Sequence, residues 1–162
     1  MSAVPARASA TPIRVVAPDA AATRALGRRI GEAGRPGDVV CLFGELGAGK
    51  TQLAKGIAAG LGVVNIVTSP SFVLMAEYEG RVPLFHLDLY RLADATEALA
   101  GGLVDERQET GVTVIEWAER LGATLPAGRL DIVFQGTGDG PRLIELRPTD
   151  ERHARLAAEA TR

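Results

Sequence analysis

The chain is poor in several residue types and sequence features, and each of these absences excludes a class of protein. Its 162 residues contain one cysteine, Cys41, so no intramolecular disulfide can form, which fits a reducing cytoplasm. We find no zinc-like cluster, no internal repeat, and no apolar run approaching the roughly 20 residues of a membrane-spanning helix. A net charge of −2 gives no basic excess for nucleic-acid binding by the whole surface. We therefore predict one cytoplasmic domain without membrane attachment, and expect a partner to hold any RNA involved.

Lysine is almost as scarce as cysteine, with two residues against sixteen arginines. One of the two, Lys50, stands in a stretch where Gly44, Gly49 and Thr51 fill the other fixed positions of the G-x-x-x-x-G-K-[ST] phosphate-binding motif. Glycines let the backbone curl with its N–H groups facing inward, which makes a nest for an anion at the start of the next helix. A compact ammonium fits this nest, whereas the wide planar guanidinium of arginine does not.

The flanking sequence agrees with this motif. Val39–Phe43 is a short apolar run typical of a buried parallel strand, and residues 52–61 have helical apolar spacing that Gly62 ends. We expect Lys50 to face solvent in the free loop and to bridge the terminal phosphates of a bound nucleotide, and Thr51 to ligate Mg²⁺. The predicted nucleotide-binding residues are Glu45, Leu46, Gly47, Ala48, Gly49, Lys50, Thr51 and Gln52.

Two later strands end in acids. Residues 84–89 carry His86 and Asp88, and the carboxyl end of an apolar strand lies at the ligand edge of an open α/β sheet. Asp88 is therefore a site candidate, and we interpret His86 as a structural neighbour. Residues 112–115 form another apolar strand, followed by Glu116 and Trp117. This pattern is typical of a Walker B carboxylate that holds Mg²⁺ or its water. The tryptophan either fills the core or covers the nucleotide site.

A hydroxyl-rich turn follows the predicted nucleotide helix. It contains Thr68, Ser69 and Ser71 around Pro70. One interpretation is a plain loop that leads into a strand over residues 72–78. The other is a switch whose hydroxyls sense the terminal phosphate or Mg²⁺ and release after hydrolysis. The residues alone favour neither.

The rest of the chain completes an α/β fold. We predict a single-domain P-loop NTPase with a mainly parallel central sheet flanked by helices, and a C-terminal β-hairpin that closes one end of the sheet. The domain is expected over residues 13–148, with a disordered tail over 1–12 and a short helix or tail over 149–162. The further elements we expect are a strand at Ile13–Ala17, a helix capped by Asp19 that runs to about residue 33, a helix over 94–103, and hairpin strands over 129–135 and 142–147.

Four segments in succession resemble one family. GELGAGKT, TSPSF, HLDLYR and IEWAER, in this order and spacing, are similar to the TsaE (YjeE) family over residues 20–147. The resemblance implies an ATPase subunit that supports threonylcarbamoyl modification of adenosine 37 in tRNA. It implies as partners the threonylcarbamoyltransferase catalytic subunit and its paralogous partner subunit, with tRNA contacted only indirectly.

The resemblance also assigns roles to individual residues. It makes Thr51 and Glu116 ligands of Mg²⁺, includes Thr68 and Ser69 in a nucleotide-responsive switch, and makes Asp88 and Trp117 functional. With Lys50, the two acids Asp88 and Glu116 are the expected catalytic residues. Gln52 departs from the family, many members of which have a second threonine there.

Other functions fit the motif less well. GTPases recognise guanine through an Asn-Lys-x-Asp segment. The sole asparagine here, Asn65, is followed by isoleucine, which disfavours a GTPase. A small P-loop kinase remains the alternative, although no segment clearly supplies its second pocket and arginine-bearing lid. A third possibility is a binding subunit in which the nucleotide acts only as a conformational clamp. It differs from the ATPase mainly in the rate of ATP hydrolysis, so the sequence does not separate the two.

Overall fold

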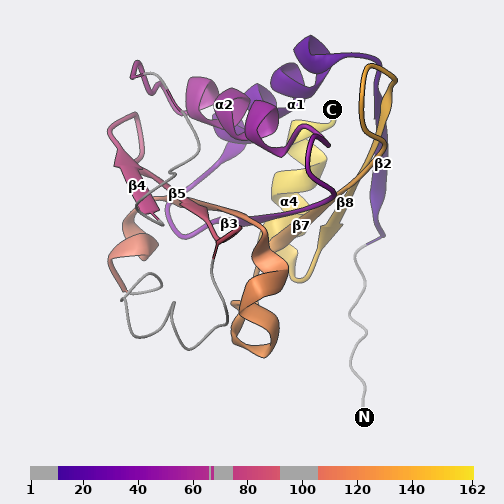
Figure 1. Ribbon diagram of the computed structural model, residues 1–162. Helices are drawn as coiled ribbons and strands as arrows, with labels where there is room; N and C mark the ends of the chain where they lie inside the picture. Colours follow the sequence, from indigo (N-terminus) through magenta and orange to yellow (C-terminus); the bar gives the residue numbers. More distant parts are fainter. Residues whose placement is uncertain (1–10, 66, 68–74, 92–105) are drawn as a thin grey trace.

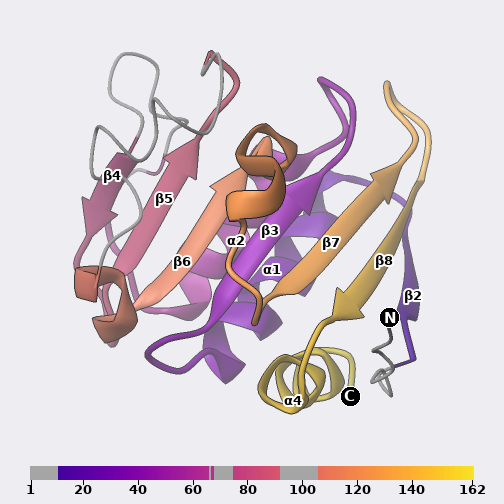
Figure 2. The same cartoon turned by 90° about the horizontal axis from the view of Figure 1, so that it is seen from below.

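The fold is seen in a computed structural model, which describes residues 11–65, 67, 75–91 and 106–162. In these residues one sheet has the strand order β2-β8-β7-β3-β6-β5-β4, and Figure 2 shows it face-on. Its strands are β2 (Ile13–Ala17), β3 (Val39–Phe43), β4 (Met75–Tyr78), β5 (Leu84–Asp88), β6 (Val112–Glu116), β7 (Leu130–Gln135) and β8 (Arg142–Pro148).

The centre of the sheet is parallel and its margins are antiparallel. Strands β7, β3, β6 and β5 run in one direction, whereas β8 against β7, β2 against β8 and β4 against β5 are antiparallel pairs. The predicted α/β class and the β7–β8 hairpin are confirmed, but the mainly parallel description holds only for these four central strands. Their carboxyl ends meet at one edge of the sheet, where ligands bind in open α/β folds.

The prediction that the hairpin closes the sheet is wrong. Strand β8 lies between β7 and β2, with Ile144 opposite Val15 of β2. Because Ile144, Glu145 and Leu146 are buried, the backbone of β8 needs hydrogen-bond partners on both sides. Strand β2 supplies them on one side and, with alternate residues exposed, is suited to be the edge strand.

Two hydrophobic clusters cover the two faces of the sheet. Helices α1 (Ala20–Ala33), α2 (Lys50–Gly60) and α4 (Glu151–Ala160) pack on one face, while the 3₁₀ segment η2 (Ala118–Thr124) packs on the other (Figures 1 and 2). A second 3₁₀ segment, η1 (Glu106–Thr110), precedes β6. Cys41 lies in the cluster beside η2, and burial raises its pKa to about 12, which keeps the thiol protonated at neutral pH.

Helices α1 and α2 cross with their backbones in contact. Glycines make this possible, because a Cβ built on Gly27 would lie 2.3 Å from the Leu53 carbonyl oxygen. A Cβ on Gly56 would lie 2.2 Å from the carbonyl oxygen of Arg24. Any side chain at these positions would push the helices apart. Helix α1 therefore fixes the position of α2, whose first turn carries Lys50 and Thr51.

The helix ends follow the expected signals. Asp19 caps α1, since its Oδ1 accepts from the N–H of Ala22 at 2.8 Å. Helix α2 begins at Lys50, two residues earlier than predicted, and Gly62 follows it with φ +81°. The last residues, left open as a helix or a frayed tail, form α4, which buries Leu156 in the cluster of the helical face.

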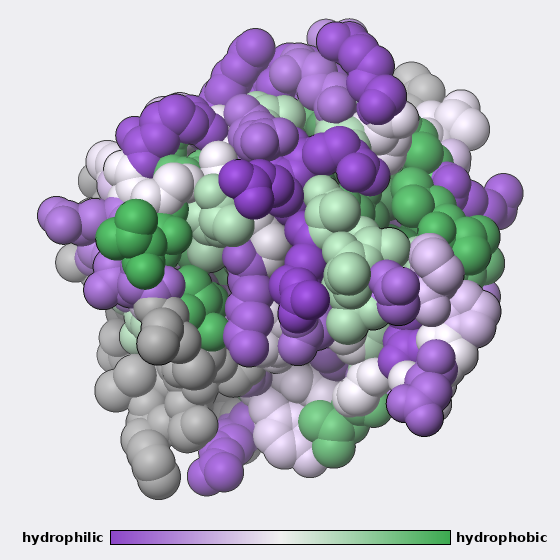
Figure 3. All heavy atoms as spheres, turned by 90° about the horizontal axis from the view of Figure 1, so that it is seen from above, coloured by the Kyte–Doolittle hydropathy of each residue, from purple (hydrophilic) through white to green (hydrophobic). Residues whose placement is uncertain are grey.

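The outer surface of the helical face is mostly hydrophilic, with smaller hydrophobic patches (Figure 3). No helix in the described part of the chain is long and apolar enough to span a membrane. Residues 1–10, the predicted switch residues Thr68, Ser69 and Ser71, and the predicted helix over 94–103 lie outside the described residues.

Candidate functional site

The phosphate loop, residues 44–51, joins β3 to α2. Gly47 and Gly49 have φ values of +82° and +104°, in the left-handed region that favours glycine. Gly49 is the N-cap of α2, so the N–H groups of Lys50 and Thr51 lie in the first turn of the helix, before its ladder of internal hydrogen bonds begins. These groups and the helix macrodipole give this end of α2 a positive field. The loop therefore has the backbone of an anion nest.

A cavity of about 460 Å³ opens at this loop. It lies at the carboxyl ends of β3, β5 and β6. Its lining residues are Leu46, Gly47, Gly49, Lys50, Thr51, Gln52, Asp88, Tyr90, Glu116 and Trp117. Two of the predicted nucleotide-binding residues do not line this cavity. Glu45 lines a second cavity of about 600 Å³, which shares Leu46 and Trp117 with the first, and the buried Ala48 lines a third of about 330 Å³.

The prediction that Lys50 faces solvent is wrong, because the side chain is 5% exposed. Its ammonium donates to the carbonyl of Gly44 and lies 3.4 Å from the centre of the Trp117 ring. Burial lowers the pKa of Lys50, and the surrounding carboxylates, Glu119 first, act in the opposite direction. The sequence could not show this, because the cover comes from a residue 67 positions later in the chain.

Trp117 is held in an unusual backbone conformation. Its φ of 58° makes it the one residue other than glycine with positive φ in the described part of the chain. Such a conformation costs on the order of 1–3 kcal/mol and is typical of functional sites. It turns the chain sharply after Glu116 and leaves the indole against the ring of Tyr90, with 4.9 Å between ring centroids. Trp117 packs against the cluster beside η2 and also lines the first and second cavities, so it has both positions considered from the sequence.

Glu116 joins three elements. Its Oε1 accepts from the Thr51 hydroxyl at 3.1 Å, which links β6 to the first turn of α2. Its Oε2 lies 2.6 Å from Nε2 of His86 on β5, and both side chains are buried. Since a carboxylate accepts, Nε2 carries the proton and holds Glu116 in place.

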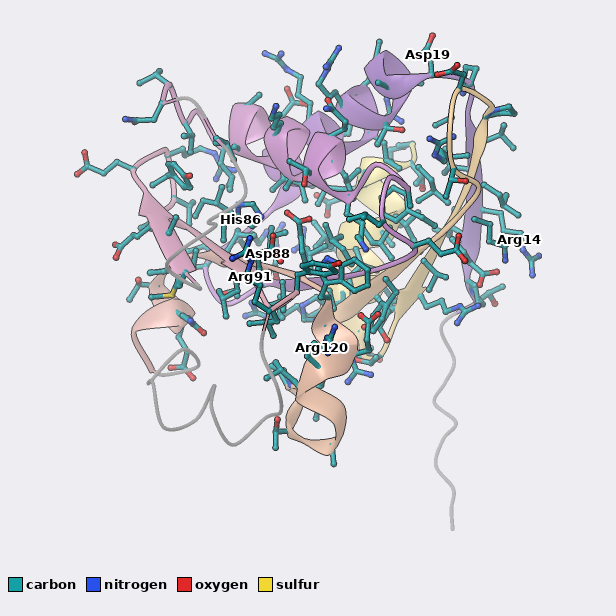
Figure 4. All side chains as sticks on the ribbon, viewed as in Figure 1. Arg14, Asp19, His86, Asp88, Arg91 and Arg120 are labelled. Atoms are coloured by element: carbon teal, nitrogen blue, oxygen red, sulfur yellow. The ribbon has the colours of Figure 1, made fainter. Side chains whose placement is uncertain are left out.

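His86 is therefore a structural neighbour of the site, as predicted, but its contact with Glu116 is a detail that sequence reasoning missed. The signal was its spacing from Asp88, because residues two apart in a strand point to the same face. Figure 4 shows His86 and Asp88 together beneath α2. Asp88 pairs in register with Glu116, lines the first cavity and accepts from the N–H of Tyr90 at 3.0 Å.

The oxygens of Thr51 and Glu116 are the hard donors that Mg²⁺ prefers. The described residues include no group of three or more His, Cys, Asp or Glu side chains arranged to hold a metal. Mg²⁺ is commonly held by one or two protein oxygens together with phosphates and water. The donor set of this site fits that mode rather than an all-protein cage.

Comparison with known proteins identifies the family. The family model described as "Threonylcarbamoyl adenosine biosynthesis protein TsaE" matches residues 17–144. The chain belongs to the TsaE family. The TsaE protein of Bacillus subtilis is 41% identical over 141 residues, which cover 86% of this chain and 88% of that one. That of Treponema pallidum is 42% identical over 134 residues, covering 83% and 99%. Both are titled tRNA threonylcarbamoyladenosine biosynthesis proteins.

A solved structure has the same fold. The crystal structure of Bacillus subtilis YdiB matches with a TM-score of 0.76 and 34% identity, covering 93% of this chain and 95% of that one. The family resemblance drawn from four motifs is thus confirmed. In this TsaE-family chain GELGAGKT forms the phosphate loop, while HLDLYR and IEWAER span the ends of β5 and β6. The TSPSF segment lies outside the described residues.

Proposed function

We propose that this chain is a Mg²⁺-dependent ATP-binding and ATP-hydrolysing subunit required for threonylcarbamoyl modification of adenosine 37 in tRNA. The observation that carries the proposal is the contact between Thr51 and Glu116 at the start of α2, directly beside the phosphate nest. Family membership supplies the pathway. The loop and the acid supply the two parts that nucleotide hydrolysis needs, an anion site and a carboxylate beside it.

The cavities around the loop suggest how ATP would lie. The phosphates would occupy the cavity lined by Lys50 and Thr51. The third cavity shares Gly47, Gly49 and Gln52 with it and would take the ribose and base. Lys50 would leave Gly44 to meet the terminal phosphates. Its compact ammonium suits this task, and its lowered pKa reflects the water-poor surroundings that strengthen such a contact.

The chain's residues divide the chemistry. Thr51 and Glu116 would hold Mg²⁺, which neutralises charge on the phosphate oxygens when bound. His86 would keep Glu116 oriented. Asp88, half-buried at the rim of the same cavity, would orient the attacking water or accept its proton. Trp117 would cover the phosphates and exclude bulk water.

The proposal includes a switch and its partners. We propose that Thr68, Ser69 and Ser71 respond to the terminal phosphate, since TSPSF follows the nucleotide helix in the order typical of the family. The threonylcarbamoyltransferase catalytic subunit and its paralogous partner would read the two states in the cytoplasm, so that hydrolysis resets the assembly. These partners would contact tRNA, in keeping with the chain's net charge of −2.

Release of inorganic phosphate from ATP tests the proposal, with and without the two partner proteins. We expect slow release by the chain alone and faster release with partners. Transfer of phosphate to an added acceptor would identify a small P-loop kinase instead. Tight binding of ATP without release of phosphate, either alone or with partners, would contradict hydrolysis and identify a nucleotide clamp.

A further inference from the structure

Arg142, the first residue of β8, reaches across to the phosphate loop. Its Nε donates to the carbonyl of Ala48 at 2.9 Å, and its Nη2 to the carbonyl of Gly47 at 3.2 Å. The same guanidinium donates to the carbonyls of Gly138, at 2.6 Å, and Gly140 in the turn of the β7–β8 hairpin. One side chain thus ties two loops together, although Arg142 lies 94 and 95 positions after the two phosphate-loop residues that it contacts.

These bonds hold the phosphate loop on the side of the third cavity, which Arg142 also lines. A peptide unit is planar, and its C=O and N–H point in opposite directions. Carbonyls of Gly47 and Ala48 that face Arg142 therefore set the direction of the N–H groups of Ala48 and Gly49. The first of these closes a turn within the loop, since Ala48 N–H donates to the carbonyl of Glu45 at 3.0 Å. The second belongs to the N-cap of α2 and faces away from Arg142.

Arginine suits this position for geometric reasons. Its planar fork carries five N–H donors, which here meet four carbonyls, and a single ammonium could not span both loops. Hydrogen bonds from a charged donor are roughly twice as strong as neutral ones. No carboxylate of the described residues forms an ion pair with Arg142, so no anion competes with the four carbonyls for its N–H donors.

We propose that Arg142 is a positioning residue for nucleotide binding, which holds the phosphate loop in its anion-binding shape through the carbonyls of Gly47 and Ala48 and couples that shape to the hairpin turn. The effect on affinity rests on the proposed nucleotide function. The effect on the loop itself does not, because it is present before any ligand binds.

The test uses the full chain and two variants. Arg142→Lys keeps the charge and loses the fork, and Arg142→Ala loses both. The matched control is Arg147→Ala, five positions further along β8, where the exposed guanidinium pairs with Glu145 and does not contact the loop. Hydrogen exchange is measured over residues 44–51 and 136–140 without nucleotide, and affinity is measured with a fluorescent ADP and Mg²⁺.

We expect faster exchange in both segments for both Arg142 variants, and affinity about tenfold weaker, as for the loss of one or two bonds to a charged donor. Arg147→Ala should match the wild type in both measurements. Unchanged exchange in a folded Arg142→Lys protein would overturn the proposal, and weaker affinity with unchanged exchange would instead show direct contact with the ligand. Faster exchange with unchanged affinity would also overturn it. If the wild type binds no nucleotide, the proposed function fails while exchange still decides whether Arg142 holds the loop.

Discussion

His86 and Glu116 form a buried pair, with 2.6 Å between the imidazole Nε2 and the carboxylate Oε2, across neighbouring parallel strands. The other oxygen of the same carboxylate accepts from Thr51. The carboxylate that would hold Mg²⁺ is thus fixed from two sides, by β5 and by α2. Partners of this kind orient metal ligands, and their loss typically lowers metal affinity by about 10- to 100-fold.

The first prediction follows from this pair. His86→Ala leaves Glu116 buried with one donor fewer, so we expect a loss of about 1–3 kcal/mol in the free energy of unfolding and a higher Mg²⁺ requirement for nucleotide binding. His86→Gln can place an amide N–H near the same carboxylate oxygen and should recover part of both. Urea denaturation and nucleotide titrations at varied Mg²⁺ measure the effects. Wild-type behaviour of His86→Ala in both would show that the pair orients nothing.

A second prediction separates the two acids. Glu116→Gln removes the anion that would face Mg²⁺, so nucleotide binding should lose much of its Mg²⁺ dependence. In Asp88→Asn the amide oxygen can still accept the hydrogen bond from the Tyr90 N–H, so nucleotide affinity should be unchanged. The hydrolysis rate should fall by about a hundredfold, because a general base is lost. Phosphate release in the presence of partners and titration of labelled nucleotide measure the two effects. Wild-type hydrolysis by both variants would mean that the site is misplaced.

Much of this architecture could be predicted because its signals are local. Each of three signals is contained in a few consecutive residues: the apolar run of β3, the glycines of the loop and the cap at Asp19. The same is true of the Glu116 position at the end of β6, where an apolar strand meets an acid. The family motifs brought these pieces together in order.

The parts that could not be predicted depend on contacts distant in sequence. The burial of Lys50 depends on Trp117, and the place of β2 at the sheet edge depends on β8 being buried. The fork of Arg142 between two loops leaves no periodic signal. His86 had such a signal, in its spacing from Asp88, but a histidine on an apolar strand is also common in cores.

The third prediction concerns the contact of α1 with α2. Gly27→Ala would place a methyl group 2.3 Å from the Leu53 carbonyl oxygen, so the helices must separate, at a cost of about 1–3 kcal/mol in the free energy of unfolding. Gly140→Ala is the control, since a Cβ there meets no atom within 4 Å, and should change stability by less than about 0.5 kcal/mol. Thermal and urea unfolding compare the two. Equal stability would mean that the crossing tolerates a wider spacing.

The fourth prediction is a pH dependence at the start of α4. Burial tends to raise the pKa of Asp150, but hydrogen bonds from the backbone and side chain of His153 outweigh it and hold the pKa below its ordinary 3.8. A lowered acid pKa means that the ionised carboxylate stabilises the fold above pH 3.8 and loses this contribution as the pH falls through the folded value.

Asp150→Asn keeps a good N-cap but cannot titrate. Its unfolding midpoint should therefore fall less than that of the wild type between pH 6 and pH 3, by an amount limited by the partial exposure of the carboxylate. Differential scanning calorimetry at both pH values measures the difference. An identical fall in both proteins would assign the acid sensitivity to other groups.

The last prediction uses the contact of Lys50 with the only tryptophan in the chain. If Lys50 leaves Trp117 to meet phosphates, the intrinsic fluorescence of the wild type should change when Mg²⁺ and ATP are added. Lys50→Ala should start from a different spectrum, show no response, and bind nucleotide at least about a hundredfold more weakly, because a buried charged contact is lost. Its unfolding midpoint should stay close to that of the wild type, since the substitution removes a charge whose burial is already unfavourable. Lys55→Ala, at the other lysine and exposed on the same helix, is the control and should respond like the wild type. A folded Lys50→Ala protein with wild-type affinity would refute the phosphate-loop assignment.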